Sequence, residues 1–262
     1  MTWTIETNEL RAFWGVVPPP TQHIAPSVSE AYSIGFNFSG TEALVEIEGR
    51  TEARSLGAFT GGANGAERIH WVSLDAPAEC AAITISDRLR LEIADELRAE
   101  RAVDLGDVWN EQEPVLTALA LRLRAAGRGG WEMSSLELEE LGRGALRYTM
   151  IEMFGARRPR INDHRLDRKQ LSRVQEYLHA NIAKRVTLSE LAAVAHISPT
   201  HFQRAFRLTT GLSPHQYQTA WRMNRAAGLI RAGVPRGTAA RAVGFTPGHG
   251  FRTAMRKFVG MP

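Results

Sequence analysis

The sequence predicts an α+β protein in two parts, a strand-rich N-terminal part with flanking helices and an all-α C-terminal part. Short β-branched and aromatic runs dominate up to about residue 86, and apolar residues recur at helical spacing after that point. The length of 262 residues suits two domains. The single cysteine excludes an intrachain disulfide framework and an all-cysteine zinc site.

Charge is divided unevenly along the chain. Residues 1–160 carry 16 arginines and 24 acidic groups, a net charge of −8, whereas residues 161–262 carry 16 basic and four acidic groups, a net charge of +12. No carboxylate side chain follows Glu190 in the last 72 residues, which contain ten arginines or lysines. A solvated surface usually interleaves both signs, so the basic part indicates a polyanionic partner. We expect one domain at 1–154, a linker at 155–167 and a basic domain at 168–262.

The N-terminal part predicts an antiparallel sandwich or small barrel, because short strand-like runs alternate with Gly, Pro and Asn clusters. The glycines at 61, 62 and 65 indicate a turn. Helices follow at 87–101, 114–126 and 134–154, and their leucines either pack on the barrel of the same chain or pair with a second copy; both are compatible. The strand candidates are residues 10–17, 31–38, 43–47, 68–74 and 81–86.

A barrel of this kind can hold a small ligand inside. Several aromatic residues either line such a pocket or fill it, and core packing is the expected role for most of them. No stretch approaches 18 uninterrupted apolar residues and the N-terminus lacks a signal-peptide pattern, so we expect a cytoplasmic protein without a membrane segment. The aromatic residues are Trp14, Tyr32, Phe36, Phe38 and Trp71.

No catalytic or metal-binding constellation appears in this part. His23 and His70 are far apart, and His70 fits packing or pocket lining better than metal ligation. Cys80, on a predicted strand edge without a neighbouring His or Cys, fits a buried structural thiol. Neither a nucleophile elbow nor a phosphate-binding loop is present. We therefore expect no enzyme activity, no metal and no cofactor.

The C-terminal part is punctuated by helix-start signals. Capping-box patterns begin at Asp167 and Thr187. A hydroxyl residue followed by proline, typical of an N-cap and the first helical position, occurs at Ser198, Ser213 and Thr246. These signals predict a series of short helices.

Two predicted helices are joined by a short turn at residues 195–197, and the length of this turn suits a helix-turn-helix. The second of them, residues 199–208, has an apolar face and a polar face. Glutamine and arginine can bond bidentately to adenine and guanine edges in the major groove, so the polar face suits base recognition. The apolar face carries Phe202, Ala205 and Phe206, and the polar face carries Thr200, Gln203, Arg204 and Arg207.

This motif recurs near the C-terminus. Residues of the segment 192–199 are matched by similar residues 48 positions later. Residues of the segment 202–212 are matched 49 positions later, so the second copy has one extra residue near Gly248. A predicted helix from Pro214 to about Ile230 separates the copies and spans about 25 Å. Such a strut can hold two recognition helices in successive major grooves, about 34 Å apart.

Several fixed spacings occur together in this half of the chain. They are Leu188-x2-Leu-Ala, Ile197-Ser-Pro-x-His-Phe-x-Arg-x-Phe206, Gly211-Leu-Ser-Pro-x-x-Tyr217, Arg222-Met-x-x-Ala226, and Gly244-Phe245 leading to Phe258-x-Gly-Met-Pro262. Together they resemble the AraC/XylS transcription regulators over residues 165–262. The resemblance implies two helix-turn-helix motifs joined by a long helix, and a cupin-like N-terminal barrel with helices for sensing and dimerisation.

The resemblance also implies which side chains contact DNA. Base-reading positions fall on Thr200, Gln203 and Arg204 in the first recognition helix, and on Gly248, His249 and Thr253, with Arg252 adjacent, in the second. Arg207, Arg256 and Lys257 lie late in their helices and suit phosphates. In the second copy, two glycines cost about 1 kcal/mol each in a helix interior, and Thr253 stands where the first copy has an arginine. We therefore expect the first motif to supply most base discrimination.

The sequence thus predicts a sequence-specific transcription regulator that binds double-stranded promoter DNA as a homodimer, with RNA polymerase and a small-molecule effector as further candidate partners. Two alternatives stay open. One is an architectural DNA-binding protein that responds to no ligand and whose barrel is filled by side chains. The other is a DNA-repair protein with a fused double helix-turn-helix, which needs a reactive cysteine that the isolated Cys80 does not resemble.

Overall fold

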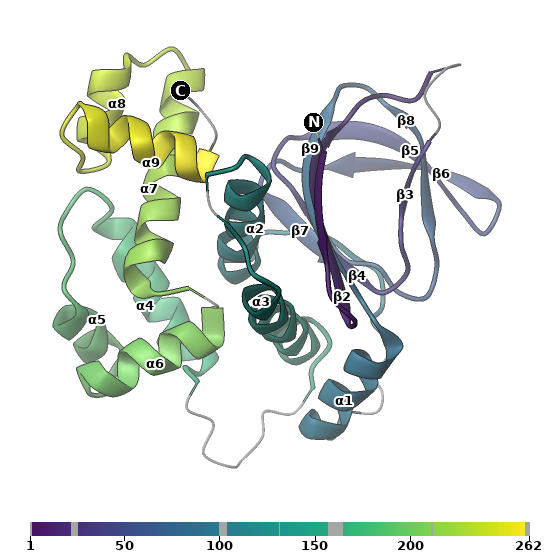
Figure 1. Cartoon of the computed structure of the whole chain (residues 1–262), viewed down its shortest axis with the longest axis horizontal. Helices are drawn as coiled ribbons and strands as arrows, with labels where there is room; N and C mark the ends of the chain where they lie inside the picture. Colours follow the sequence, from purple (N-terminus) through teal and green to yellow (C-terminus); the bar gives the residue numbers. More distant parts are fainter. Residues whose placement is uncertain are drawn as a thin grey trace. The chain divides into compact units, whose positions relative to one another are not determined.

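The computed structural model describes residues 2–21, 26–99, 104–130, 132–156, 165–210 and 212–259. Contacts divide the chain into two compact units. The barrel unit comprises Met1–Leu123 and Met133–Ile161, and the helical unit comprises Arg124–Glu132 and Asn162–Pro262. Residues 157–164 of the expected linker lie outside the described residues. Figure 1 shows the helices and strands of both units, coloured along the chain from purple at the N-terminus to yellow at the C-terminus.

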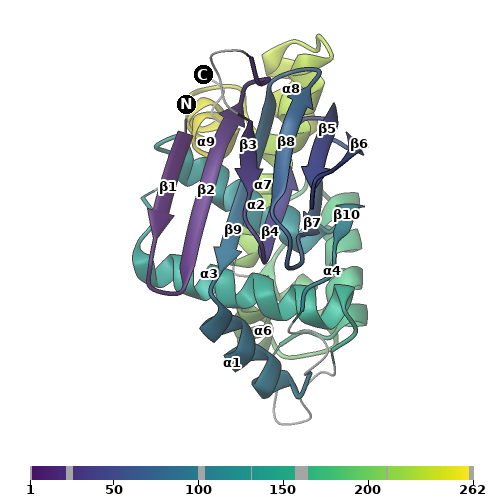
Figure 2. The ribbon, with the colours of Figure 1, turned by 90° about the vertical axis from the view of Figure 1, so that its right-hand side faces the viewer.

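Two antiparallel sheets form the barrel unit in the described part of the chain, which confirms the predicted all-antiparallel architecture (Figure 2). The strand order is β1-β2-β9-β4-β7-β10 in the six-stranded sheet and β3-β8-β5-β6 in the four-stranded sheet. The strands are β1 Thr2–Glu6, β2 Leu10–Val17, β3 Ser27–Ser29, β4 Ser33–Asn37, β5 Thr41–Ile47, β6 Arg50–Leu56, β7 Thr60–Ala63, β8 Ile69–Leu74, β9 Ala78–Ile85 and β10 Val108–Glu111.

The predicted turn at the glycine cluster is wrong, because Gly61 and Gly62 lie within strand β7. A Cβ atom at Gly62 would come within 2.0 Å of the Val108 carbonyl oxygen on β10, the strand paired with β7. The glycine is therefore needed for close approach of a neighbouring strand. Although glycine is typical of turns, Gly62 lies in a strand and forms no turn.

Three helices follow β9 in the chain, with β10 between the first two. They are α1 Asp87–Leu97, α2 Pro114–Gly127 and α3 Ser135–Tyr148, the last continuing into the π-helical turn η2 Thr149–Met153. Helix α1 ends earlier than the predicted residue 101. At its end Arg98 is left-handed, with φ of 50°, and its N–H donates to the carbonyls of Ala94 and Asp95. This C-cap geometry closes the helix.

One face of the six-stranded sheet packs against helices. Alternate residues of β2, Leu10, Ala12 and Trp14, are buried. A Cβ atom at Gly142 on α3 would lie 2.3 Å from the Leu10 side chain, so the helix backbone sits directly on this face. Trp14 and Phe38 are almost fully buried and pack in the core, as expected for most of the aromatic residues.

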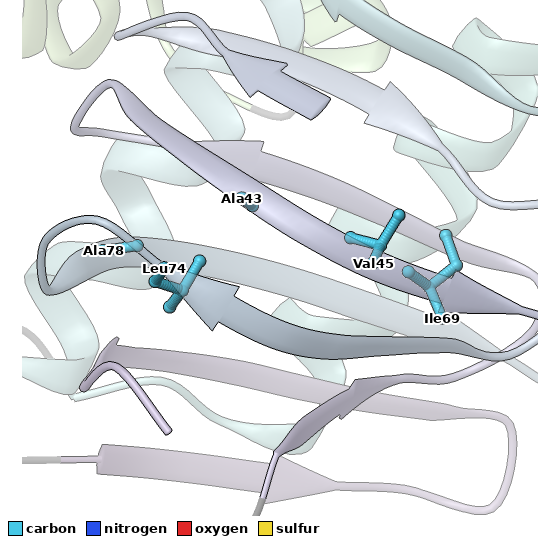
Figure 3. Packing of buried hydrophobic residues seen from close by; sticks show 5 residues of the cluster. All are labelled: Ala43, Val45, Ile69, Leu74 and Ala78. Carbon is cyan, nitrogen blue, oxygen red and sulfur yellow. The ribbon is translucent and has the colours of Figure 1, made fainter. Parts of the chain in front are cut away.

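A second apolar cluster lies on the inner face of the four-stranded sheet (Figure 3). Val45 on β5 and Ile69 on β8 have no exposed surface, and Trp71 and Trp109 pack against the cluster from its edge. The cluster consists of Ala43, Val45, Ile69, Leu74 and Ala78 (Figure 3).

The helical unit contains helices in the predicted order. Helix α4 packs on α5, α5 on α6, and both α8 and α9 on α7. The predicted capping boxes at Asp167 and Thr187 are confirmed, and Ser213 forms a third. The helices are α4 Arg168–Ala180, α5 Leu188–Ala195, α6 Pro199–Thr210, α7 Pro214–Arg231, α8 Arg236–Ala242 and α9 His249–Val259.

The predicted helix start at Thr246 is wrong, because α9 begins at His249. The Arg252 N–H donates to the Gly248 carbonyl over 3.1 Å, so Gly248 is the N-cap and Gly250 lies in the first turn. The extra residue of the second copy lengthens the turn and delays the helix. Neither glycine therefore sits in a helix interior, and the cost expected there does not arise.

No described helix of this chain is both long and apolar enough to cross a membrane.

Candidate nucleic-acid interface

The first helix-turn-helix consists of α5, a tight turn and α6. His196 ends α5 in the left-handed conformation, with φ of 57°, and its N–H donates to the carbonyls of Ala192 and Ala193. The Ile197 N–H donates to the Ala192 carbonyl over 3.1 Å, which completes the turn. Phe202 and Phe206 on α6 are fully buried, so the opposite face of α6 is presented to solvent.

The second motif repeats this turn 48 residues later. Gly244 is left-handed with φ of 76°, and the Phe245 N–H donates to the Ala240 carbonyl over 2.9 Å. These positions correspond to His196, Ile197 and Ala192 in the first motif. The repeat found in the sequence is therefore also a repeat in backbone geometry.

Every side chain predicted to contact DNA lies on α6 or α9. All are exposed except Lys257, which is half-buried. They are Thr200, Gln203, Arg204 and Arg207 on α6, and His249, Arg252, Thr253, Arg256 and Lys257 on α9.

Arginines of the two units differ in their partners. In the barrel unit, Arg143 and Arg147 form ion pairs with Glu92 and Glu96. Within the described residues, Arg204, Arg252 and Arg256 have no carboxylate within 4 Å and thus form no ion pair. Unneutralised, exposed guanidinium groups on two helices suit a polyanion.

The acidic residues of the helical unit are engaged locally. The Thr187 hydroxyl and N–H donate to Glu190, and these bonds hold the pKa of the Glu190 carboxyl below its ordinary value. Asp167 accepts the Gln170 N–H at the start of α4. These carboxylates cap helices, so the recognition helices keep their positive charge.

A hollow lies beside the second recognition helix. It has a volume of about 310 Å³ and lies between α7, α8 and α9, lined in part by Ile230, Gly237 and Met255. Gly237 of α8 stands where Ser189 stands in the first motif, so this wall of the hollow has no side chain at that position.

A cavity of about 310 Å³ lies within the barrel unit. One wall is made of residues paired across neighbouring strands. Phe13 of β2 is paired with Ala82 of β9, and Ala82 is paired with Gly35 of β4. Small residues at the centre of the sheet therefore create the space. Of the five aromatic candidates, Phe36 and Trp71 line it, whereas the Tyr32 ring lies 3.4 Å from the Arg90 guanidinium.

Two expectations for the barrel unit are wrong. His70 is exposed and lines no pocket, because its side chain points to the solvent face of β8. Cys80 is not at a strand edge, because it lies inside β9, and its side chain lines the cavity. Burial raises the pKa of the Cys80 thiol to about 12. A thiol that stays protonated is a poor nucleophile, which counts against the alkyl-transfer alternative.

Metal-binding clusters of three or more His, Cys, Asp or Glu are absent from the described residues. His23 lies outside those residues. Arg222 of α7 belongs to the family-like pattern, but the sequence predicts no contact for it. In the structure its guanidinium donates to the backbone carbonyls of Ile182 and Lys184. The signal for Arg222 in the sequence is its place in the pattern Arg222-Met-x-x-Ala226.

Comparison with known proteins supports the helical unit specifically. A family model described as a helix-turn-helix domain matches residues 191–262. A protein named as a transcriptional regulator, LumQ of Photobacterium leiognathi, is 27% identical over 102 residues, which are 38% of this chain and 41% of LumQ. A protein named as an AraC-like transcription regulator of Streptomyces antibioticus is 31% identical over 86 residues, 32% of this chain and 28% of the relative.

The chain thus matches less than half the length of these relatives. The solved structure of ToxT from Vibrio cholerae O395 covers 96% of this chain and 94% of its own, at 13% identity and a TM-score of 0.35, which is too slight a likeness to carry an argument. The matched segment contains α6, α7, α8 and α9 and most of α5. Residues 191–262 are therefore a helix-turn-helix domain, and the chain is similar over part of its length to an AraC-like transcription regulator.

Proposed function

We propose that the chain is a sequence-specific DNA-binding transcription regulator. The observation that carries this proposal is a set of exposed arginines on two helices, none of which has a carboxylate partner in the described part of the chain: Arg204 on α6, and Arg252 and Arg256 on α9. Helix α6 presents glutamine and arginine, the residues that discriminate bases in the major groove. Regulators of this kind are not usually enzymes, and we propose no catalytic step.

Base discrimination is assigned mainly to Thr200, Gln203 and Arg204, because α9 has Thr253 at the position of Arg204 and so lacks this base-reading arginine. On α9, His249, Arg252 and Thr253 occupy the corresponding face. Arg207, Arg256 and Lys257 lie later in the helices and hold phosphates, a role without sequence information. The domain of residues 168–262, preceded by a linker, is the DNA-binding part of this proposal.

The decisive experiment measures binding of the purified full chain to its own upstream region by fluorescence anisotropy, with random DNA as control, at several salt concentrations. We expect specific affinity about 10³-fold or more above that for random DNA, with a steep salt slope. Equal affinities with equal slopes would leave an architectural DNA-binding protein instead of a site-specific regulator.

The barrel cavity is proposed as the site of a small-molecule effector. Its lining combines aromatic walls with small residues, and a Cβ atom at Gly35 would meet nothing within 4 Å. Gly35→Phe should therefore fill the cavity without displacing the sheet. In a thermal-shift screen, a compound that raises the melting temperature of the wild type should lose this effect on Gly35→Phe. A shift that survives the substitution would place the compound elsewhere.

Dimerisation is proposed through the helices of the barrel unit. Leu91 on α1 and Leu136 on α3 are exposed apolar side chains, which suits a second copy as the partner. Sedimentation equilibrium of Leu136→Glu should show a smaller dimer fraction than the wild type.

A role at promoters also implies contact with RNA polymerase and a cytoplasmic location.

A further inference from the structure

The segment that follows α4 is held by side chains of α7. The Arg222 guanidinium donates from Nε to the Ile182 carbonyl over 2.6 Å and from Nη2 to the Lys184 carbonyl over 2.5 Å. Gln218 Nε2, one turn earlier on α7, also donates to the Lys184 carbonyl, over 3.3 Å. Two α7 side chains therefore fix the backbone of residues 182–184, which we call the α4 loop.

The same loop meets the turn of the second motif on its other side. A Cβ atom at Gly244 would lie 2.0 Å from the Ala183 carbonyl oxygen, so only glycine fits there. The Arg222 guanidinium also lies 5.8 Å from the centre of the Phe245 ring. The α4 loop is thus in contact with both α7 and the turn that precedes α9.

Arg222 is suited to this place by its shape. Its guanidinium is half-buried, and burial lowers its pKa from the ordinary value. Within the described residues no carboxylate lies within 4 Å of it, so its hydrogen bonds to the two carbonyls offset the cost of burial. A planar, forked guanidinium reaches two acceptors at once, which a lysine ammonium on a single stem does less well.

The loop connects the two motifs mechanically. On one side it continues from α4, which packs on α5, and α5 packs on α6. On the other side it touches Gly244, and α9 and α8 pack on α7. A displacement of the α4 loop would therefore change the separation and angle between α6 and α9, which a long single helix alone does not fix.

We propose that Arg222, with Gln218 and Gly244, clamps the α4 loop and thereby sets the spacing between the two DNA half-sites that the domain accepts. Arg222 is a positioning residue in this proposal and contacts no base. The proposal rests on the proposed function, because it needs a bipartite DNA site. One base pair changes the separation of two half-sites by about 3.4 Å and rotates one against the other by about a tenth of a turn.

The experiment starts from a bipartite site selected out of random DNA by the full-length wild-type protein. Affinities are measured for this site, for versions lengthened or shortened by one base pair between the half-sites, and for the half-site read by α6 alone. Arg222→Lys keeps the charge and removes the fork. Arg225→Lys, at an exposed arginine of the same helix, is the matched control.

For the wild type and Arg225→Lys we expect a sharp optimum of spacing. For Arg222→Lys we expect about tenfold weaker binding at the optimum, little change at the altered spacings and no change on the half-site, because only simultaneous engagement of both motifs depends on the clamp. The salt slope should stay the same. Equal losses at every spacing and on the half-site would overturn the proposal in favour of a direct contact between Arg222 and DNA.

A second variant covers the case in which Arg222→Lys does not fold. Gln218→Ala removes one bond to the α4 loop and should broaden the spacing optimum in the same direction, to a smaller extent. Circular dichroism establishes folding for each variant. If a folded Gln218→Ala keeps the wild-type optimum, the clamp is overturned. If the wild type selects no site at all, the proposed function fails instead, so the two failures are distinguishable.

Discussion

Individual side chains carry much of the proposed DNA recognition. Arg204 on α6 is exposed and has no carboxylate partner among the described residues, whereas Arg143 and Arg147 of the barrel unit are each paired. Whether an arginine reads DNA or stabilises its own fold is decided by its neighbours. The sequence alone shows the residue type, and for Arg204 the helical spacing also placed it on the exposed face.

Arg204→Ala tests base reading directly. We expect specific affinity to fall by about 1–3 kcal/mol and sequence preference to relax, because a bidentate contact to a base edge is lost. Fluorescence anisotropy with specific and random DNA measures both effects. Arg225→Ala, on the exposed side of α7, is the control for loss of one charge. A loss of equal size on both DNAs would contradict the base-reading role.

His179 on α4 predicts a pH dependence of stability. It is half-buried against Trp221, 4.4 Å between ring centres, and burial lowers its pKa below the ordinary value. The unfolded chain therefore binds a proton at higher pH than the folded chain does. The free energy of unfolding should fall as pH drops from about 6.5 toward the lowered pKa.

Urea unfolding of the wild type and His179→Phe at pH 7.5 and pH 5.0 measures this effect. The decrease on acidification should be smaller for His179→Phe, which has no proton to gain. His215→Gln, at an exposed position of α7, should behave like the wild type. Equal decreases for wild type and His179→Phe would show that other groups dominate the acid response.

At the level of helices and strands, end signals were more informative than interior composition. The capping boxes at Asp167 and Thr187 are local, since each joins residues three apart, and both form as predicted. Strand β7 was missed because its sequence, Thr-Gly-Gly-Ala, has beyond its threonine none of the β-branched and aromatic residues that mark a strand, and its partner β10 is only four residues long. The two glycines of β7 serve a neighbouring strand that no local pattern reveals.

Two glycines of α3 should respond oppositely to the same substitution. Gly144→Ala should raise the free energy of unfolding by about 0.5–1 kcal/mol, because alanine favours the helix and its Cβ meets nothing within 4 Å. Gly142→Ala should lower it by about 1–3 kcal/mol, because the new Cβ meets the buried Leu10 side chain. Urea unfolding compares the pair; stabilisation by both would mean that Leu10 moves aside freely.

Across the whole molecule, local charge matters more than net charge. The formal net charge is only +4, yet residues 161–262 carry +12. Because charges farther away than about 8–10 Å are screened at physiological salt, DNA responds mainly to the charge of the surface that touches it. The acidic N-terminal half therefore lowers the net charge, while Arg204, Arg252 and Arg256 form no ion pair within the described residues.

Arg256→Gln and Arg50→Gln remove the same charge from the two units and provide a matched test. Arg256 is exposed on α9 and Arg50 is exposed on β6. We expect the slope of log affinity against log salt to decrease in magnitude by about one for Arg256→Gln and to stay unchanged for Arg50→Gln. Equal changes for both would indicate a response to net charge.

The sequence by itself determined the antiparallel first part, the helical second part and the repeated motif. Each depends on residues close together in the chain, through period, capping or fixed spacing, so local physics suffices. The apolar faces of α6 and α9 also followed from spacing. The face of α6 opposite its apolar residues is the exposed face that carries Arg204.

Only the tertiary structure decided the features that depend on distant partners. The barrel cavity arises because rows such as Phe13, Ala82 and Gly35 meet across strands, which places small residues opposite one large one. The hydrogen bonds from Arg222 to the α4 loop join residues about 40 positions apart. Such contacts are set by how elements pack, and a sequence pattern within one element contains no information about the neighbour it will meet.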